Sequence, residues 1–286
     1  MEVADIFEKL GTYTGRFPRK AIEEAVRCQE KITPELLRVL EEACKWDMDH
    51  FSEAEEMDKS LLCLYAMYLL AQFREKSAHP LVVVLSRMDE ARLDMLLGET
   101  TTDGLDRILA STFGGDSSLI ESLIEDPTVN EYVRAAGISA LKILVAKGDK
   151  ARDEVVAYYK ALFNGRLERS YSFVWDELIS SATRLHPQEV YDDIIAAFEE
   201  GLGDGGYMEI TDVKKLNAMS PEKVLKRLSD ATLGYIEDTV KEMQWWTCFN
   251  REKYEPHQQN NPQEYSRPFI PPTLPSLSKI GPNDPC

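Results

Sequence analysis

Cysteine is scarce in this sequence, and its spacing excludes one class of protein. The 286 residues contain five cysteines, an odd number, and no two of them form a C-x-x-C pair. A secreted scaffold held together by disulfides is therefore not expected. We expect reduced thiols packed among helices, in a protein of the cytoplasm.

Positive charge is also scarce. Lysine and arginine total 33 against 50 aspartates and glutamates, which leaves a formal net charge of -17. Binding to a phosphate backbone or to an anionic membrane surface requires clustered basic residues, so we expect no direct DNA binding by the body of the protein. The charge suits a protein or peptide partner with a basic surface, or simply confers solubility.

Long hydrophobic runs are missing. The longest, LLCLYAMYLLA from Leu61 to Ala71, is too short for a membrane span, which needs about 20 apolar residues. The first ten residues carry Glu2, Asp5 and Glu8 and no apolar core, unlike a secretory signal. We therefore expect the long run to be a buried helix and the protein not to be a membrane protein.

Strand patterns are nearly absent, and helical patterns fill the first 249 residues. Only Leu81–Leu85 (LVVVL) has a strand-like composition, and it has no partner run. Elsewhere apolar residues recur at helical spacing between Pro, Gly and Asp turns, which predicts an all-α protein. We predict helices that begin near Pro18, Thr33 and Asp126, with others near Met57–Arg74, Pro80–Arg87, Ala91–Leu97, Gly104–Phe113, Ser117–Ile124, Arg152–Leu162, Ser172–Arg184, Pro187–Glu200, Thr211–Asn217 and Pro221–Thr247.

The spacing of these helices favours a repeat architecture. Successive pairs recur every ~35–45 residues, the range of HEAT and related repeats. We therefore expect stacked antiparallel helix pairs over residues 1–249, a HEAT-like α-solenoid. A compact helical domain without repeats is the alternative.

The last 37 residues differ in composition from the rest. Eight of the 14 prolines lie from Pro256 to Pro285, and the four basic and four acidic residues after Asn250 cancel. The whole charge of -17 is thus carried by the helical body. We expect residues 250–286 to form an extended proline-rich tail.

Two stretches resemble a known bacterial family. They are FPRKAIEEAVRCQEKITPELLRVLEEA (17–43) and the block that begins GLDRILASTFGGDSSLIESLIEDPTVNEYVRAAG and ends at Phe163. Both are similar to the uncharacterised family designated domain of unknown function eleven-eighty-six. The resemblance extends over roughly residues 1–245 and implies a HEAT-like helical fold, with no catalytic residues to assign.

The final residues, Lys279 to Cys286 (KIGPNDPC), resemble the start of a SEC-C zinc knuckle. That motif continues with further cysteines, and here the sequence stops at the first one. A single thiolate cannot form the four-ligand site of a structural zinc ion. The resemblance implies that Cys286 is a metal ligand only in a longer chain with a complete knuckle, and that the chain as given binds no cofactor.

Two motifs invite a catalytic interpretation. Residues 201–206 (GLGDGG) match G-x-G-x-x-G, but they follow a helix rather than a strand, so we interpret them as a turn between helices. The acidic run from Asp47 to Asp58 is interpreted as a loop before the buried helix, with an acidic docking segment as the alternative. The four histidines are scattered and form no recognisable catalytic or metal pattern.

The densest aromatic cluster is Trp245, Trp246, Phe249 and Tyr254. These residues either cover the core at the last helix pair or form an exposed patch for a partner, since Trp and Tyr dominate binding hot spots. Taken together, the patterns favour a non-catalytic interaction scaffold or adaptor with an acidic surface. The alternative is an enzyme that binds a small molecule in a groove between the helices.

Overall fold

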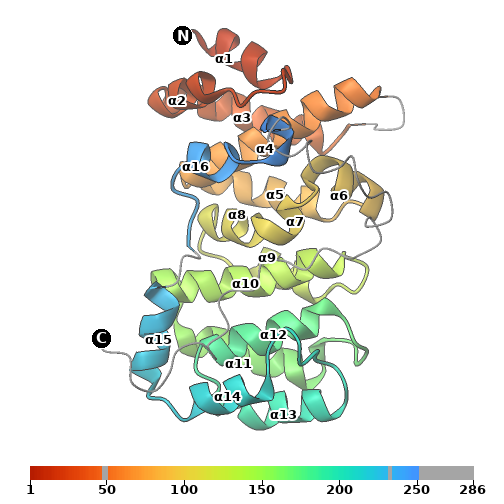
Figure 1. Cartoon of the computed structure of the whole chain (residues 1–286), viewed down its shortest axis with the longest axis vertical. Helices are drawn as coiled ribbons and strands as arrows, with labels where there is room; N and C mark the ends of the chain where they lie inside the picture. Colours follow the sequence, from red (N-terminus) through yellow and green to blue (C-terminus); the bar gives the residue numbers. More distant parts are fainter. Residues whose placement is uncertain (47–50, 231–233, 251–286) are drawn as a thin grey trace, which may run out of the picture.

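The apolar segments of the sequence are helical in the computed structural model of the chain (Figure 1). The structure describes residues 1–46, 51–230 and 234–250, and these contain no β-strand. The prediction of an all-α fold is confirmed, and Leu81–Leu85 lies inside a helix. The helices are α1 (Val3–Leu10), α2 (Arg19–Arg27), α3 (Gln29–Ala43), α4 (Glu53–Gln72), α5 (His79–Ser86), α6 (Glu90–Leu97), α7 (Thr100–Asp103), α8 (Leu105–Ser111), α9 (Ser118–Glu125), α10 (Glu131–Lys147), α11 (Arg152–Ala161), α12 (Phe173–Arg184), α13 (Tyr191–Glu199), α14 (Ile210–Asn217), α15 (Pro221–Asp230) and α16 (Thr239–Met243).

The helices are arranged in two layers, and within each layer they are stacked one above the other along the long axis of the molecule (Figure 1). Contacts within the first layer join α4, α8, α10, α12 and α14 in that order. The second layer contains α3, α5, α9, α11 and α13. Each of these helices packs against at least one helix of the first layer. Neighbouring helices bury their apolar faces against one another, so a single core extends from Ile6 to Met243.

Helix α10 lies at the centre of the stack. Every residue from Val133 to Leu144 is buried, and the helix packs on α8, α9 and α12. A helix that is covered on all sides must be apolar or carry paired charges. Gly148, with φ of 81°, ends it in the left-handed conformation that glycine tolerates, as the sequence predicts.

The start of α4 corrects the interpretation of the acidic run. Ser52 caps the helix and exchanges hydrogen bonds with Glu55, so residues 53–58 form its first turns instead of a loop. This Ser-x-x-Glu pattern is a capping box, a signal visible in the sequence. Residues 47–50 lie outside the part that the structure describes.

The start of α3 also differs from the prediction. The helix begins at Gln29, directly after α2, and Pro34 lies inside it. Its first amide groups bond to the carbonyl of Cys28, and the Thr33 hydroxyl donates to the carbonyl of Gln29 at 2.8 Å. Pro34 is the sixth residue of the helix and has no amide hydrogen to donate to the carbonyl of Glu30, so the helix continues past it with one backbone bond fewer.

The predicted long helix from Pro221 to Thr247 is wrong. The chain forms α15, passes through an extended segment from Gly234 to Glu237, and then forms the short helix α16, which Asp238 caps. We call residues 221–230 and 234–250 the C-terminal strap. It starts beside α10 and α12 and returns past α4 to α2 near the other end of the stack (Figure 1).

Candidate functional site

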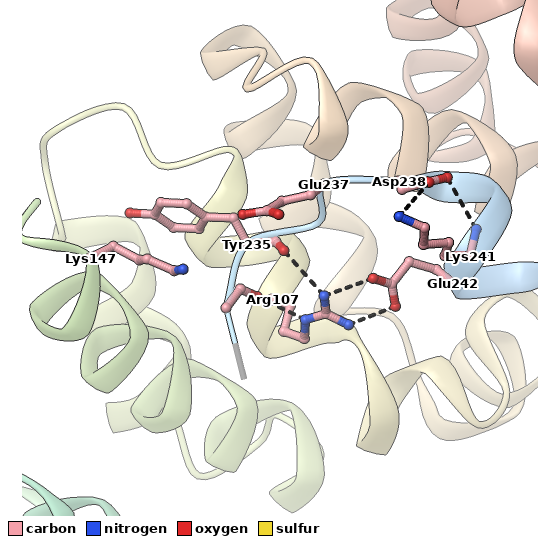
Figure 2. A pocket seen from close by; sticks show the side chains of 8 residues that line it. Arg107, Lys147, Tyr235, Glu237, Asp238, Lys241 and Glu242 are labelled. Atoms are coloured by element: carbon pink, nitrogen blue, oxygen red, sulfur yellow. Dashed lines mark hydrogen bonds and ion pairs between the residues drawn. The ribbon is translucent and has the colours of Figure 1, made fainter. Parts of the chain in front are cut away.

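One arginine of the stack binds the strap at several atoms (Figure 2). Arg107 on α8 donates from Nη1 to Oε2 of Glu242 at 2.7 Å and from Nη2 to Oε1 at 2.8 Å. Its Nε donates to the carbonyl of Gly234 at 2.8 Å, and Nη2 also reaches the carbonyl of Tyr235 at 3.1 Å. One guanidinium group thus binds both the extended segment and α16.

Other side chains of the stack bind the backbone of the strap. The amide of Ile236 donates to the hydroxyl of Ser111 at 2.9 Å, and the amide of Thr239 donates to Oε1 of Gln72 at 2.8 Å. Backbone groups that lack a helix or sheet partner need such bonds when they are covered. Sequence reasoning missed Arg107, Ser111 and Gln72, because no local pattern marks a residue whose partner lies more than a hundred positions away.

A polar cleft of about 250 Å³ lies between the strap and the stack. The side chain of Tyr235 lines this cleft together with Lys147, whose ammonium group lies 5.7 Å from the centroid of the tyrosine ring (Figure 2). The guanidinium carbon of Arg74 lies 3.3 Å from the same centroid. Burial raises the pKa of Tyr235 to about 12, so its hydroxyl, which donates to Asp149, stays protonated. Charges of both signs line the cleft: Arg107, Lys147, Lys241, Glu237, Asp238 and Glu242.

The predicted aromatic site does not form one patch. Trp246 packs on Tyr68, with ring centroids 5.7 Å apart, and Phe249 packs on Phe17 at 5.4 Å. Trp245 points away and is 61% exposed. Tyr254 lies outside the described residues.

These aromatic residues lie against the first helices of the stack and not the last ones, where the sequence placed them. The hydroxyl of Tyr13 donates to the carbonyl of Cys248 at 2.6 Å, which fixes the end of the strap near α1. Half of the predicted cluster therefore serves an intramolecular contact, and Trp245 is its exposed member.

A network of charged side chains is buried between α8, α10 and α12. Lys142 donates to Glu177 at 2.9 Å, and their side chains are 4% and 7% exposed. Glu177 also accepts from the hydroxyl groups of Ser181 and Tyr207. Asp106 accepts from Ser139 at 2.8 Å, and burial raises the pKa of its carboxyl group. Each of these polar groups has a partner, so the network is suited to positioning side chains within the core.

In residues 1–46, 51–230 and 234–250, no three His, Cys, Asp or Glu side chains gather in a group that suits a metal ion. No helix in those ranges has both the length and the apolar composition needed to cross a bilayer. Cys286 and the proposed start of a zinc knuckle lie outside the described residues.

The glycine-rich motif is a turn, as the sequence indicates. Residues 201–206 connect α13 to α14, and no strand precedes them. A Cβ atom on Gly203 would lie 2.5 Å from Cδ1 of Ile179, so this turn packs closely on α12. The amide of Asp204 donates to Asp176 at 2.6 Å. The motif thus has a packing role, and its amide groups bind protein atoms.

Comparison with known proteins gives a family without an assigned activity. The chain is 41% identical over 247 residues to an uncharacterised protein of Chlamydia trachomatis serovar D, an alignment that covers 86% of this chain and 96% of that protein. An uncharacterised protein of Chlamydia muridarum is also 41% identical over 247 residues, with 86% and 97% covered. No solved structure matches the chain. The model of the family described as "Protein of unknown function (DUF1186)" matches residues 1–250, up to the end of the strap, and the chain therefore belongs to this family.

Proposed function

We propose that this protein is a non-catalytic interaction scaffold or adaptor of the cytoplasm that binds a partner with a basic surface. The main support for the proposal is that most arginines in the described ranges are already paired within the chain, so few of them are free to offset the acidic surface. Most arginines of the described part form ion pairs with carboxylates of the same chain: Arg19, Arg27, Arg38, Arg74, Arg87, Arg92, Arg107, Arg134, Arg152, Arg166 and Arg169.

The charge that remains on the surface is negative. Residues 1–250 carry the whole excess of 17 acidic groups, because the charges after Asn250 cancel. Such a surface attracts a basic partner over about 10 Å at moderate ionic strength and orients it before contact.

The cavities of the structure give less support to an enzyme. Two of them have volumes of about 250 Å³ each, whereas pockets for small molecules usually measure about 300–1,000 Å³ and are largely apolar. Four of the charged groups that line the cleft under the strap are paired with one another, Arg107 with Glu242 and Lys241 with Asp238. We therefore favour binding of a protein partner over catalysis on a small molecule.

Salt-dependent affinity capture tests the proposal. Tagged protein would be incubated with extract of its native cells, and bound proteins eluted with increasing sodium chloride and identified by mass spectrometry. We expect strongly basic proteins that elute as the salt rises, because screening weakens contacts between exposed charges. Partners that stay bound regardless of salt would contradict the electrostatic mechanism.

A pair of charge variants provides the control. Neutralisation of three exposed acids that form no ion pair in the described part (Glu30→Gln, Glu41→Gln and Asp192→Asn) should weaken capture. Neutralisation of two exposed lysines (Lys20→Gln and Lys31→Gln) should leave it unchanged or strengthen it. Equal capture by both variants would point to a partner recognised without charge.

A further inference from the structure

Three aromatic rings lie in a row at the N-terminal ends of α10 and α12. The ring of Phe173 is 5.1 Å from that of Tyr132 on one side and 5.1 Å from that of Tyr207 on the other. Tyr132 and Tyr207 are 41% and 42% exposed, and the neighbouring Tyr171 is 59% exposed. Few large apolar or aromatic side chains of the described residues are this exposed, and three of them gather here.

Hydrogen bonds from their hydroxyl groups hold two of the tyrosine rings in place. The hydroxyl of Tyr207 donates to Glu177 at 2.8 Å, and Glu177 is itself fixed by the buried Lys142. The hydroxyl of Tyr171 lies 3.3 Å from Oδ2 of Asp176. Aromatic side chains fixed in this way lose little conformational entropy when a partner binds.

Three carboxylates lie near the rings, and one of them, Asp176, is only 3% exposed, with its two oxygens bound to the amide of Asp204 and the hydroxyl of Tyr171. Glu131 accepts from the amide of Phe173 at 2.6 Å. Burial raises the pKa of Asp176 to about 6, and the negative charges of Asp204 and Glu131 add to this effect. Within the described part of the chain, none of the three forms an ion pair with lysine or arginine. The carboxylates of Asp126, Glu189 and Glu200, by contrast, each pair with an arginine.

We name this surface the tyrosine patch: Tyr132, Tyr171, Phe173 and Tyr207 with Glu131 and Asp204. The buried Asp176 supports it through its bonds to Tyr171 and Asp204. It lies at the end of α10 opposite Lys147 and the strap, about 25 Å away along the helix. It is thus separate from the polar cleft and from Trp245, and it uses none of the residues that hold the strap.

We propose that the tyrosine patch binds an arginine side chain in an exposed basic segment of a partner protein. A guanidinium group stacks on the negative face of an aromatic ring and donates paired hydrogen bonds to a carboxylate. The patch supplies both, in its tyrosine rings and in the carboxylates of Glu131 and Asp204, which are not buried. The proposal rests on the proposed function and names the surface and the chemistry by which it would operate.

Fluorescence anisotropy with defined peptides tests the proposal. The probes are fluorescein-labelled octapeptides in which glycine alternates with arginine, with lysine or with glutamate. The arginine peptide should bind the wild-type protein best and the glutamate peptide should not bind. The double variant Tyr132→Ala/Tyr171→Ala should weaken the arginine peptide about fivefold or more, since each exposed cation–π contact contributes about 0.5–1 kcal/mol.

Two controls separate the patch from the rest of the surface. Trp245→Ala removes an equally exposed ring at the strap and should leave binding unchanged. Tyr171→Phe keeps the ring and should retain most of the affinity. Circular dichroism and the melting temperature verify that each variant is folded, which we expect because the substituted tyrosines are exposed.

Each outcome has a distinct meaning. Equal binding of the arginine peptide to the wild type and the double variant would overturn the tyrosine patch but leave the proposed function standing. Failure of the wild type to bind either basic peptide would contradict both. Equal affinity for the lysine peptide would overturn the assignment of arginine. Self-association of the wild type that the double variant abolishes, measured by sedimentation, would show that a second copy of the chain occupies the patch.

Discussion

Arg107 and Glu242 lie 135 positions apart in the sequence and form an ion pair with two short hydrogen bonds, 2.7 and 2.8 Å. Their side chains are 17% and 24% exposed. This pair joins the middle of the stack to the strap that returns along it, so the strap is part of the folded body.

Replacement of Arg107 by alanine should therefore release the strap. The change removes the ion pair and the bonds to two strap carbonyls, and we expect the free energy of unfolding to fall by about 2–3 kcal/mol. Hydrogen exchange should show loss of protection at the amides of Ile236 and Thr239. The matched control is Arg38→Ala, which breaks the exposed pairs with Glu35 and Glu42 and should cost less than about 1 kcal/mol.

The adjacent tryptophans of the strap should behave differently. Trp246→Ala removes the contact with Tyr68 and the stacking on Phe249, and we expect a loss of about 2–3 kcal/mol for this half-buried ring. Trp245→Ala should change stability by less than about 0.5 kcal/mol, because its side chain is largely exposed. Urea denaturation of the two variants measures both values, and equal losses would contradict the placement of these rings.

The buried pair of Lys142 and Glu177 should show strong coupling. Lys142→Met leaves the Glu177 carboxylate buried without its cation, and we expect a loss of about 3–5 kcal/mol. The double variant Lys142→Met/Glu177→Gln should regain most of this loss, since the amide oxygen still accepts from Ser181 or Tyr207. A double-mutant cycle from thermal denaturation gives the coupling energy. Additive losses would mean that the two groups do not interact in the folded protein.

The raised pKa of the Asp176 carboxyl group should make the free energy of unfolding depend on pH. Its pKa is about 6 in the folded protein against an ordinary value of 3.8. The folded state therefore binds this proton more tightly than the unfolded state, and the group lowers stability as the pH rises from about 4 to about 6. Asp176→Asn should be more stable than the wild type at pH 7, by about 3 kcal/mol, with the difference disappearing near pH 4.

Asp126→Asn is the control with the opposite sign. Hydrogen bonds from Thr128 and Arg87 lower the pKa of Asp126 to about 2. Its contribution is present above pH 4 and is lost as the pH falls toward 2, so the variant should be less stable than the wild type at pH 7. Urea denaturation of both variants between pH 3 and 8 compares the two slopes. Parallel slopes would contradict the assignment.

Much of the fold follows from local patterns in the sequence. The apolar spacing in Val133–Leu144 and the glycine at 148 predict α10 and its end. Ser52 and Glu55 form a capping box, which marks the start of α4 in the sequence, although the acidic residues around them are also typical of a loop. Helix periodicity and caps act within a few residues, which is why a single sequence reveals them.

The sequence by itself determined that the chain is helical, that its body is acidic and that it resembles one family over roughly residues 1–245. Only the tertiary structure decided that the C-terminal strap returns to the first helices, that Trp246 packs on Tyr68 and that three exposed tyrosines gather near Asp176. These relationships join residues from helices and loops far apart in the chain. They depend on how the helices stack. Local helix propensity does not determine which distant side chain each residue contacts.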